Sequence, residues 1–404
     1  MKNSILLFFI SPFIGLVQAF KYYKADWAKN SVWLFIVFYG FTMFRTESMD
    51  SFRYVLKLRM LYDSPLNWDI FLANFYSDDG GSVDIYEPLI TYSLSLITNN
   101  GNILFAVFGL VFGYFYSRNI WLIIGLSEGK EINKYGWYLI IAFCCVVGFW
   151  TLNGVRMFTA AHIFFYGAFL YLMNNEKKGF LIAASSVLVH FSFVLPVGLL
   201  ILFITIRIPW RILYLFFIGS FFISSLNINS IKVRLESITP AFLLPRVNGY
   251  TSEEYIEVIS DINNSANWYI NYYSKSISWF IVIIFTYIYF YKKNINAYSK
   301  SFSNLFGFSL LFLTLGNITS LLPSGSRFLF IAQLFGMALV FLFSIEYGDK
   351  LFRRWLLLLT PLLLFFIIVS IRTSFDTLTI ETIIMNPIFS AFVDFPVPLI
   401  DIFK

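Results

Sequence analysis

Long apolar runs rich in Phe, Ile and Leu alternate with short polar segments along almost the whole chain. About ten of these runs approach the roughly 20 residues that an α-helix needs to cross the hydrocarbon core of a bilayer. Inside lipid such runs must be helical, because unpaired backbone groups cannot be left facing hydrocarbon. The pattern predicts spanning helices over residues 4–20, 30–45, 102–117, 136–151, 155–173, 209–227, 277–291, 303–320, 327–345 and 355–371.

Two further apolar stretches do not fit one simple crossing. Residues 87–98 would cover only about 18 Å as a helix, against a core about 30 Å thick, and are predicted to enter and leave on the same side. Residues 179–206 carry basic residues at both ends and His190 and Pro196 in the middle, which favours two short helices. The alternative is a single tilted crossing, which would move three basic loops downstream to the outer side.

Basic residues set the predicted orientation, because short loops rich in Lys and Arg stay in the cytoplasm. The lysines after the first run outnumber Lys2, so this run is predicted to be a helix with its N-terminus outside, and not a cleaved signal peptide. Residues 46–86, 228–276 and the tail 372–404 then lie outside. The short loops kept inside contain Lys21, Lys24 and Lys29; Arg118, Lys130 and Lys134; Lys177 and Lys178; Arg207 and Arg211; Lys292, Lys293 and Lys300; and Lys350, Arg353 and Arg354.

Composition excludes a soluble globular protein. Of the residues 58% are hydrophobic and 13% are charged, whereas about a quarter are charged in soluble domains. No internal repeat or low-complexity linker is evident, so residues 1–404 are predicted to form one all-α integral membrane domain. Cys144 and Cys145 are adjacent and indicate no disulfide framework. With two histidines and no thiolate cluster, neither a metal site nor a cofactor is expected.

Two arginines stand at the outer boundary, where membrane helices begin. Arg156 follows an Asn-Gly-Val stretch and Arg327 follows a Ser-Gly-Ser stretch. At such positions a guanidinium and a helix N-terminus can both face an anion. A planar, permanently charged fork also suits phosphate oxygens better than a lysine does. The alternative for each arginine is snorkelling to lipid head groups.

Acidic, phenolic and imidazole groups supply further candidates. Asp84, Tyr86 and Glu87 surround the start of the predicted re-entrant segment, and a carboxylate held against hydrocarbon is suited to act as a general base. The alternative is an ordinary helix start. His190 lies at the break between the two short helices, where an imidazole in apolar surroundings needs a partner; a site role and a structural hydrogen bond are both open. His162, deeper in its helix, is interpreted as a packing residue.

Two outer features have ordinary interpretations beside functional ones. The Asp78-Asp79-Gly80-Gly81 stretch could hold a divalent cation through oxygen ligands, but a solvated turn is favoured. Aromatic residues of the loop 228–276 could stack on sugar rings, although those after residue 267 are more typical of an interfacial belt. They are Tyr250, Tyr255, Trp268, Tyr269, Tyr272 and Tyr273.

The order of these motifs along nearly the whole chain resembles the EpsG-like and Wzy-type polymerases of O-antigen and exopolysaccharide assembly. The chain departs from that pattern at Met49, near an aspartate that commonly follows a glycine, and at Met157, where glutamine is common. The resemblance is carried by Arg45 with Asp50 and Tyr54, by Tyr86-Glu87-Pro88, by Asn153-Gly154-Val155-Arg156, by Lys177-Lys178 through Val189-His190-Phe191-Ser192 to Pro196, and by Arg327.

The resemblance implies a bacterial inner-membrane glycosyltransferase that joins undecaprenyl-pyrophosphate-linked oligosaccharide units on the periplasmic face. It also implies a fold similar to the multispanning glycosyltransferases that use lipid-linked donors. Beside the lipid-linked substrate and the bilayer, a polysaccharide chain-length regulator is a candidate partner, and nucleic acid is not. A membrane acyltransferase that modifies surface polysaccharide and a flippase of lipid-linked oligosaccharide are the alternatives.

Such a transfer needs a base for the acceptor hydroxyl and positive charge for the departing pyrophosphate. Glu87 or His190 is the expected base, and Arg156 and Arg327 are expected to hold the pyrophosphate. The expected substrate-binding residues are Arg45, Asp50, Tyr54, Asp84, Tyr86 and Arg246.

Overall fold

The computed structural model describes residues 4–77, 81–206, 208–223, 237, 239–241, 244–250, 252–291, 298–393 and 395–403. In these residues all regular structure is helical, and strand-type pairing is limited to two isolated bridges. Some side chains within α1 (Ser4–Ile10), α14 (Leu244–Tyr250) and α15 (Glu253–Ser265) lie outside the description. The predicted all-helical class is therefore confirmed for the described part of the chain.

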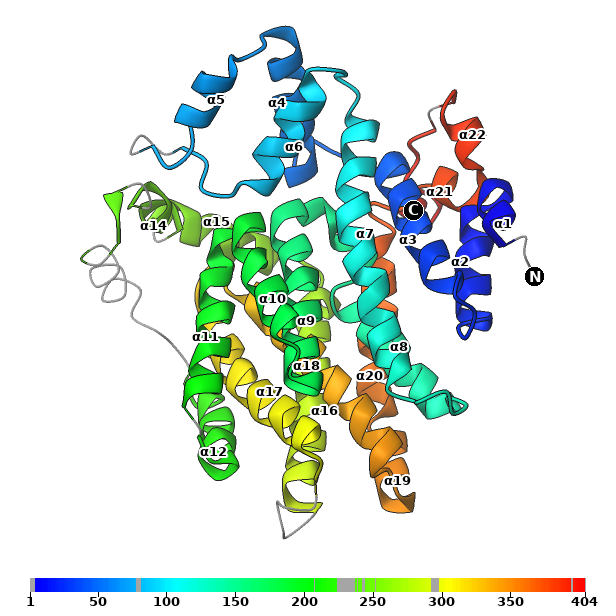
Figure 1. Cartoon of the computed structure of the whole chain (residues 1–404), viewed down its shortest axis with the longest axis vertical. Coiled ribbons are helices and arrows are strands. Elements are labelled where there is room, and N and C mark those ends of the chain that lie inside the picture. Colours follow the sequence, from blue (N-terminus) through cyan, green and yellow to red (C-terminus); the bar gives the residue numbers. More distant parts are fainter. Residues whose placement is uncertain are drawn as a thin grey trace.

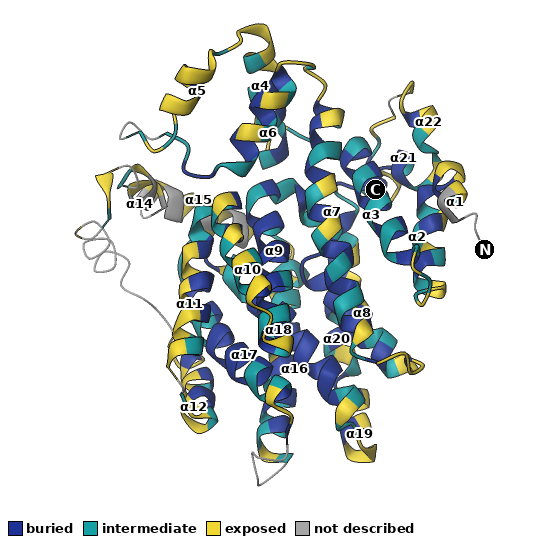
Figure 2. Ribbon diagram, viewed as in Figure 1, coloured by how far each residue is buried: buried dark blue, intermediate teal, exposed yellow. Residues whose placement is uncertain are grey.

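A bundle of long helices forms the body of the molecule (Figure 1). Figure 2 shows that its buried residues concentrate on α9, α17 and α18, while α11, α12 and α19 expose one face. The bundle consists of α7 (Gly101–Gly125), α8 (Lys134–Val146), the 3₁₀ turn η1 (Phe149–Gly154), α9 (Val155–Asn174), α10 (Lys177–Val189), η2 (Phe191–Phe193), α11 (Val194–Thr205), α12 (Trp210–Ser220), α16 (Trp268–Tyr291), α17 (Lys300–Thr319), α18 (Ser326–Glu346), α19 (Lys350–Leu358) and α20 (Thr360–Ser374).

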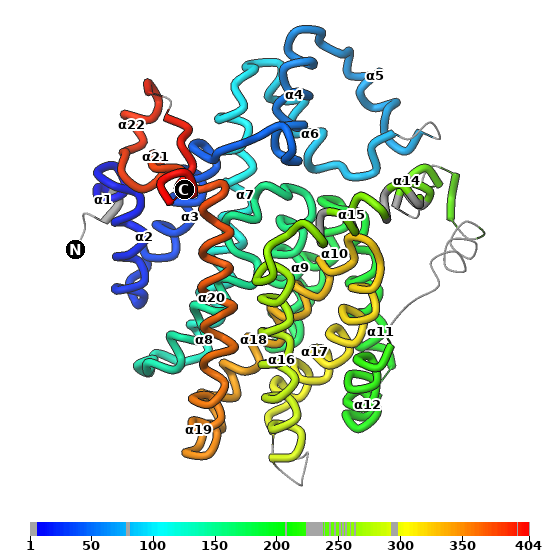
Figure 3. The backbone as a smooth tube through the Cα atoms, turned by 180° about the vertical axis from the view of Figure 1, so that it is seen from behind, coloured from blue at the N-terminus to red at the C-terminus, as the bar shows by residue number. Residues whose placement is uncertain are grey.

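Smaller helices cover the upper end of this bundle in Figure 1. Three of them, α4 (Asp50–Asp63), α5 (Trp68–Ala73) and α6 (Tyr86–Ser95), lie above α9 and α10, near α14 and α15. To one side are α1, α2 (Pro12–Lys21) and α3 (Ala28–Thr42), against which the C-terminal α21 (Ile380–Ile384) and α22 (Pro387–Ser390) fold back. The last turn, η5 (Leu399–Ile402), is hydrogen-bonded to the segment after α20. From behind, α16 and α20 are seen to lie side by side (Figure 3).

Five helical stretches of the described residues are long and apolar enough to cross a bilayer, and a bent pair makes a sixth if it is counted as one span. The pair is α19 and α20, which meet at an angle of 51° next to Pro361. The first predicted run is also broken, into α1 and α2, where Ser11 caps α2 and Pro12 occupies its first turn. The stretches are Gly101–Gly125, Lys134–Asn174, Trp268–Tyr291, Lys300–Thr319 and Ser326–Glu346.

The break predicted within residues 179–206 is confirmed. Helix α10 ends at Val189, His190 adopts an extended backbone, and α11 starts at Val194 after one 3₁₀ turn. Figure 1 shows α10 rising to the upper end and α11 returning from it, so both connections to the rest of the bundle lie at the lower end. Helix α6 has ten residues and is too short to cross a bilayer. Re-entry of this segment stays a prediction.

The described helix ends next to the predicted inner loops lie toward the lower side of the molecule in Figure 1. The connections α2–α3 and α7–α8 are in direct contact, because the Lys24 ammonium donates to the carbonyl oxygen of Gly129 at 3.2 Å. The predicted orientation assigns both of these connections to the same side. Which side faces the cytoplasm stays a prediction.

Glycines allow α9 and α10 to approach closely along their length. A Cβ atom at Gly167 would lie 2.3 Å from the amide nitrogen of Ala183, and one at Gly179 would lie 2.6 Å from the carbonyl oxygen of Gly167. Small residues at such crossings are the usual means by which membrane helices pack backbone to backbone. This packing holds the second half of α9 against the start of α10.

We predict that Gly167→Ala lowers the free energy of unfolding by about 1–3 kcal/mol, because the added methyl group must push two backbones apart. Gly198→Ala in α11 is the matched control: nothing lies within 4 Å of its Cβ position. That change should raise stability by up to about 1 kcal/mol through helix propensity. The measurement is the thermal midpoint of both purified variants in one detergent, and equal shifts would contradict the close crossing.

Candidate functional site

A cavity of about 720 Å³ lies at the upper end of the helical body. Its walls come from α4, η1, the first turns of α9 and α18, the end of α20 and the residue that joins α10 to η2. Segments far apart in the sequence therefore form one chamber. The polar and aromatic side chains that line it include Asp50, Arg53, Tyr54, Trp150, Asn153, Arg156, His190, Arg327, Thr373 and Asp376.

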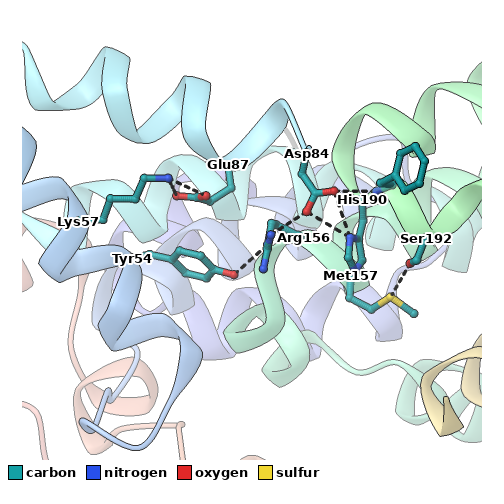
Figure 4. A network of polar contacts seen from close by, with 9 residues as sticks. Tyr54, Lys57, Asp84, Glu87, Arg156, Met157, His190 and Ser192 are labelled. Atoms are coloured by element: carbon teal, nitrogen blue, oxygen red, sulfur yellow. Dashed lines mark hydrogen bonds and ion pairs between the residues drawn. The ribbon is translucent and has the colours of Figure 1, made fainter. Parts of the chain in front are cut away.

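The carboxylate of Asp84 contacts two lining residues of this cavity, Arg156 and His190, and one backbone amide (Figure 4). It accepts a hydrogen bond from Arg156 Nη1 at 2.7 Å and from the amide of Phe191 at 2.7 Å. His190 Nδ1 lies 3.3 Å from the same carboxylate. Asp84 is only 1% exposed, so its charge is compensated almost entirely by these partners.

Local backbone contacts explain why Asp84 reaches this position. The amide of Ile85 donates to the carbonyl oxygen of Leu188 at 3.0 Å, which ties the segment before α6 to the last turn of α10. Helix α10 ends at Val189, and the Phe191 amide then starts a new turn and needs an acceptor. Asp84 supplies that acceptor, as side-chain oxygens commonly do where helices begin.

The environment of Asp84 keeps it ionised. Burial by itself would raise the pKa of this carboxyl, but the hydrogen bond from His190, the charges of His190 and Arg156 and the Phe191 amide outweigh burial and hold the pKa at about 2. An ionised carboxylate only accepts hydrogen bonds. The proton of the His190–Asp84 contact is therefore on Nδ1, and in the neutral ring Nε2 is left as a basic nitrogen.

Arg156 is held on a second side by a tyrosine. Its Nε donates to the Tyr54 hydroxyl at 3.2 Å, and its Nη1 is bound to Asp84. Burial raises the pKa of Tyr54, so this hydroxyl stays protonated and can donate a hydrogen bond of its own. Nη2 of Arg156 has no partner in the part of the chain that the structure describes. The guanidinium is fixed in orientation while one edge remains available.

Arg327 contributes a second guanidinium to the lining of the cavity, from another helix. It lies in the first turn of α18, where the chain turns tightly: a Cβ at Gly325 would lie 1.8 Å from the carbonyl oxygen of Thr319, and Ser324 has φ +59°. Glycine is required at such an approach. Among the described residues Arg327 has neither a hydrogen-bond acceptor nor an ion-pair partner.

Glu87 does not line the cavity. Its carboxylate is 3% exposed, with both oxygens 3.2 Å from Lys57 Nζ and one accepting from the Thr91 hydroxyl at 3.0 Å. Figure 4 shows this pair beside Tyr54, separate from the cluster at Asp84. Of the two expected bases, the structure places His190 at the cavity and Glu87 in an ion pair between α4 and α6.

The other predicted residues divide between the cavity and its surroundings. Asp50 lines the cavity and pairs with Arg53 within α4. Arg45 lies off the cavity, with hydrogen bonds to Asn102 and Gly40 and its guanidinium 5.2 Å from the ring centre of Phe105. Tyr86 packs against Phe108 and its hydroxyl is buried. The side chain of Arg246 lies outside the described residues, although Gly249 of the same helix lines the cavity.

The end of α20 forms a wall that the sequence did not indicate. Thr373, Asp376 and Thr377 line the cavity there, and Asp376 accepts two hydrogen bonds from Arg372 at 2.9 and 3.1 Å. The predicted topology assigned these residues to an outer tail. Their only local signal is an arginine and an aspartate four residues apart, with Arg372 in the last turn of α20 and Asp376 just after it.

The remaining histidine and acidic residues have simpler roles. His162 is buried in α9 between Asn119 and the carbonyl oxygen of Val147, as expected of a packing residue. In the described part of the chain no group of three or more His, Cys, Asp or Glu residues is placed to hold a metal ion. Asp78 and Asp79 lie outside that part, as do the side chains of two aromatic loop residues, Tyr250 and Tyr255.

We predict that Asp84→Asn lowers the free energy of unfolding by about 3 kcal/mol or more, because it leaves Arg156 without its buried counter-charge. The matched control is Asp50→Asn, which breaks an exposed Asp–Arg pair of the same site and should cost under about 1 kcal/mol. The measurement is thermal or denaturant unfolding of both variants.

The depressed pKa of Asp84 fixes the pH window of this effect. Its stabilisation is fully present above the ordinary carboxyl pKa of about 4 and is lost as pH falls through about 2. The loss of stability caused by Asp84→Asn should therefore still be present at about pH 5 and should shrink only in more acidic solution. Its absence at about pH 5 would show that Asp84 is not held ionised by these partners.

Comparison with known proteins gives no further guide. No protein-family model, curated protein or solved structure matches the chain.

Proposed function

We propose that the protein is a polysaccharide polymerase that transfers a growing glycan from its polyprenyl pyrophosphate to the next lipid-linked repeat unit. The observation that carries the proposal is the convergence of Arg156, Arg327 and His190 on one cavity. These residues belong to three separate segments of the chain. A cavity with two guanidinium groups and a carboxylate-bound imidazole offers what glycosyl transfer from a pyrophosphate requires.

The two arginines would hold the pyrophosphate. Arg156 is fixed by Asp84 and Tyr54 and keeps Nη2 for a ligand, so it can donate to a phosphate oxygen without rearrangement. Arg327 adds a positive charge at the start of α18, where the helix dipole also favours an anion. Donors already in place at the position where negative charge develops stabilise the transition state most effectively.

His190 would act on the acceptor. Its Nε2 takes the proton of the acceptor hydroxyl while the hydroxyl oxygen forms a bond to the anomeric carbon of the donor sugar. The bond from that carbon to the pyrophosphate oxygen breaks, and its electron pair leaves with the polyprenyl pyrophosphate. Asp84 accepts from Nδ1 throughout and stabilises the imidazolium that forms. Asp84 is thus a positioning residue and not a substrate ligand.

Other residues of the cavity lining suit a sugar. They include Trp150, Asn153 and Asp376, whose aromatic and planar polar groups can contact a pyranose face and its hydroxyls. A cavity of about 720 Å³ has room for sugar residues beside a pyrophosphate.

The proposal includes a finer topology than the helices by themselves define. It places the cavity end of the bundle in the periplasm and the lower end in the cytoplasm of a bacterial inner membrane. It also assigns the shorter helices, with the long ones, to an architecture of about ten crossings like that of the multispanning glycosyltransferases. The short α3, α10, α11 and α12 would line or complete the bundle within the membrane.

We predict that Arg156→Ala and Arg327→Ala each reduce polymerisation roughly 10²- to 10³-fold, as removal of a transition-state donor does. Arg→Lys should rescue only in part, because an ammonium cannot replace a bidentate fork. The assay is the ladder of chain lengths formed by purified protein from lipid-linked repeat units.

The control for this series is Arg354, an exposed arginine of α19 at the other end of the molecule, whose Ala and Lys variants should retain full activity. Full-length ladders from Arg156→Ala and Arg327→Ala at normal protein levels would contradict the proposed pyrophosphate site. A product of unchanged chain length that carried fewer acyl groups would instead favour the acyltransferase.

Two matched substitutions by glutamine distinguish between the two expected bases. We predict that His190→Gln lowers kcat roughly 10²- to 10⁴-fold, since a glutamine cannot take the proton. Glu87→Gln should lower the thermal midpoint, because it leaves Lys57 without its partner, and should change kcat by less than about tenfold. If Glu87→Gln lowered kcat more than His190→Gln did, at equal thermal stability of the two variants, the base would be Glu87.

A further inference from the structure

A second cavity, nearly free of polar atoms, borders the polar one. It measures about 410 Å³ and lies between α2, α3, α8 and α20, with Trp150 in its wall. Trp150 also lines the polar cavity. We call this second space the apolar cleft, and its other walls include Val17, Phe35, Ile141, Cys144 and Ile371.

The lining of the apolar cleft offers hydrocarbon contacts. The hydroxyl of Tyr116, one of its few polar groups, donates to the carbonyl oxygen of Cys144 at 3.1 Å. Val17, Ile141 and Ile371 are 52%, 44% and 41% exposed, so the cleft has an open edge lined by aliphatic side chains. An open apolar edge of this kind on a membrane protein faces lipid and not water.

We propose that the apolar cleft binds the first isoprene units of a polyprenyl pyrophosphate whose charged group occupies the arginine-lined cavity. This inference rests on the proposed function and adds the site of the lipid. A pyrophosphate held by Arg156 and Arg327 is covalently attached to its chain, so the chain must leave the polar cavity at once. The apolar surface that shares a wall with that cavity is the cleft behind Trp150.

The charged groups near the two ends of the cleft favour a polyprenyl pyrophosphate over a phospholipid. At its other end the cleft shares Trp137 with a cavity of about 590 Å³ that contains Lys21 and Lys24. A phospholipid anchored at those lysines would enter from that end with its acyl chains. The substrate enters from the Trp150 end, where its anionic group is met by guanidinium forks, which suit phosphate better than ammonium groups do.

The binding test uses full-length protein and a polyprenyl pyrophosphate that carries a photoreactive diazirine in its second or third isoprene unit. We expect the label on peptides of α2 and α8, the helices that contribute Val17 and Ile141, and we expect unlabelled polyprenyl pyrophosphate to compete. Labelling elsewhere would overturn the proposal. Equal competition by phosphatidylglycerol would show a general lipid groove and would overturn it as well.

A bulky side chain tests the same site. Val17→Trp fills the cleft and should reduce the label at least tenfold, whereas Leu181→Trp, at a 66% exposed position of α10 outside the cleft, should not change it. Ile141→Trp, from another helix, repeats the test if Val17→Trp fails to accumulate. Full labelling of folded Val17→Trp and Ile141→Trp would exclude the cleft.

A substrate with a short lipid separates this inference from the proposed function. Wild type should show a KM at least tenfold lower for the long-chain repeat unit than for one whose pyrophosphate carries a short alkyl group in place of the isoprene chain, and Val17→Trp should lose that preference. Labelling of the cleft in a protein that polymerises neither substrate would refute the polymerase and leave the lipid site. Polymerisation with no preference for the substrate with the longer lipid would refute the lipid site and leave the polymerase.

Discussion

The buried carboxylate of Asp84 is bound by a guanidinium from α9, a backbone amide from the start of η2 and an imidazole from the end of α10. A charge so deeply buried is tolerated only when all of these partners are present. The three segments cannot shift independently, because any displacement leaves either the carboxylate or Arg156 without compensation. The relative position of Arg156 and His190 is therefore set by Asp84 and does not depend on a bound substrate.

Helix packing brings these partners within reach before the carboxylate fixes them. Gly167 and Gly179 let the second half of α9 and the start of α10 run nearly in contact, and the two helices go on packing against each other toward the cavity. The hydrogen bond from Ile85 to Leu188 then attaches the loop that carries Asp84 to the same turn. Close packing of the helices thus places the segments whose side chains form the polar network at the end of the bundle.

Much of the local structure could be predicted from the sequence, because it depends on local patterns. The break at His190, the helix starts before Arg156 and Arg327 and the short helix after Tyr86 each follow from residues within one turn. The lengths of the helices could be predicted less well from the sequence. Apolar runs give no signal for the bend between α19 and α20 or for the break between α1 and α2 beyond a single proline.

Partners across the fold could not be predicted, because they depend on which helix ends meet. Glu87 and Asp84 are similar acidic residues near one helix start, yet Lys57 from α4 neutralises the first and Arg156 holds the second. The contribution of Asp376 needs the path of α20 back to the upper end. Sequence shows that a charged residue needs a partner, and only the tertiary structure shows which one it has.

The arginines in and beside the cavity differ in whether an aspartate of the protein balances their charge. Arg53, Arg156 and Arg372 are matched within the described residues by Asp50, Asp84 and Asp376. Arg327, from the first turn of α18, has no such match there. A half-buried guanidinium beside helix N-terminal amides is favourable only when an anion or water completes it. The positive charge at Arg327 and the free edge of Arg156 together favour an anion with two separate charged groups over a single carboxylate, and a pyrophosphate is such an anion.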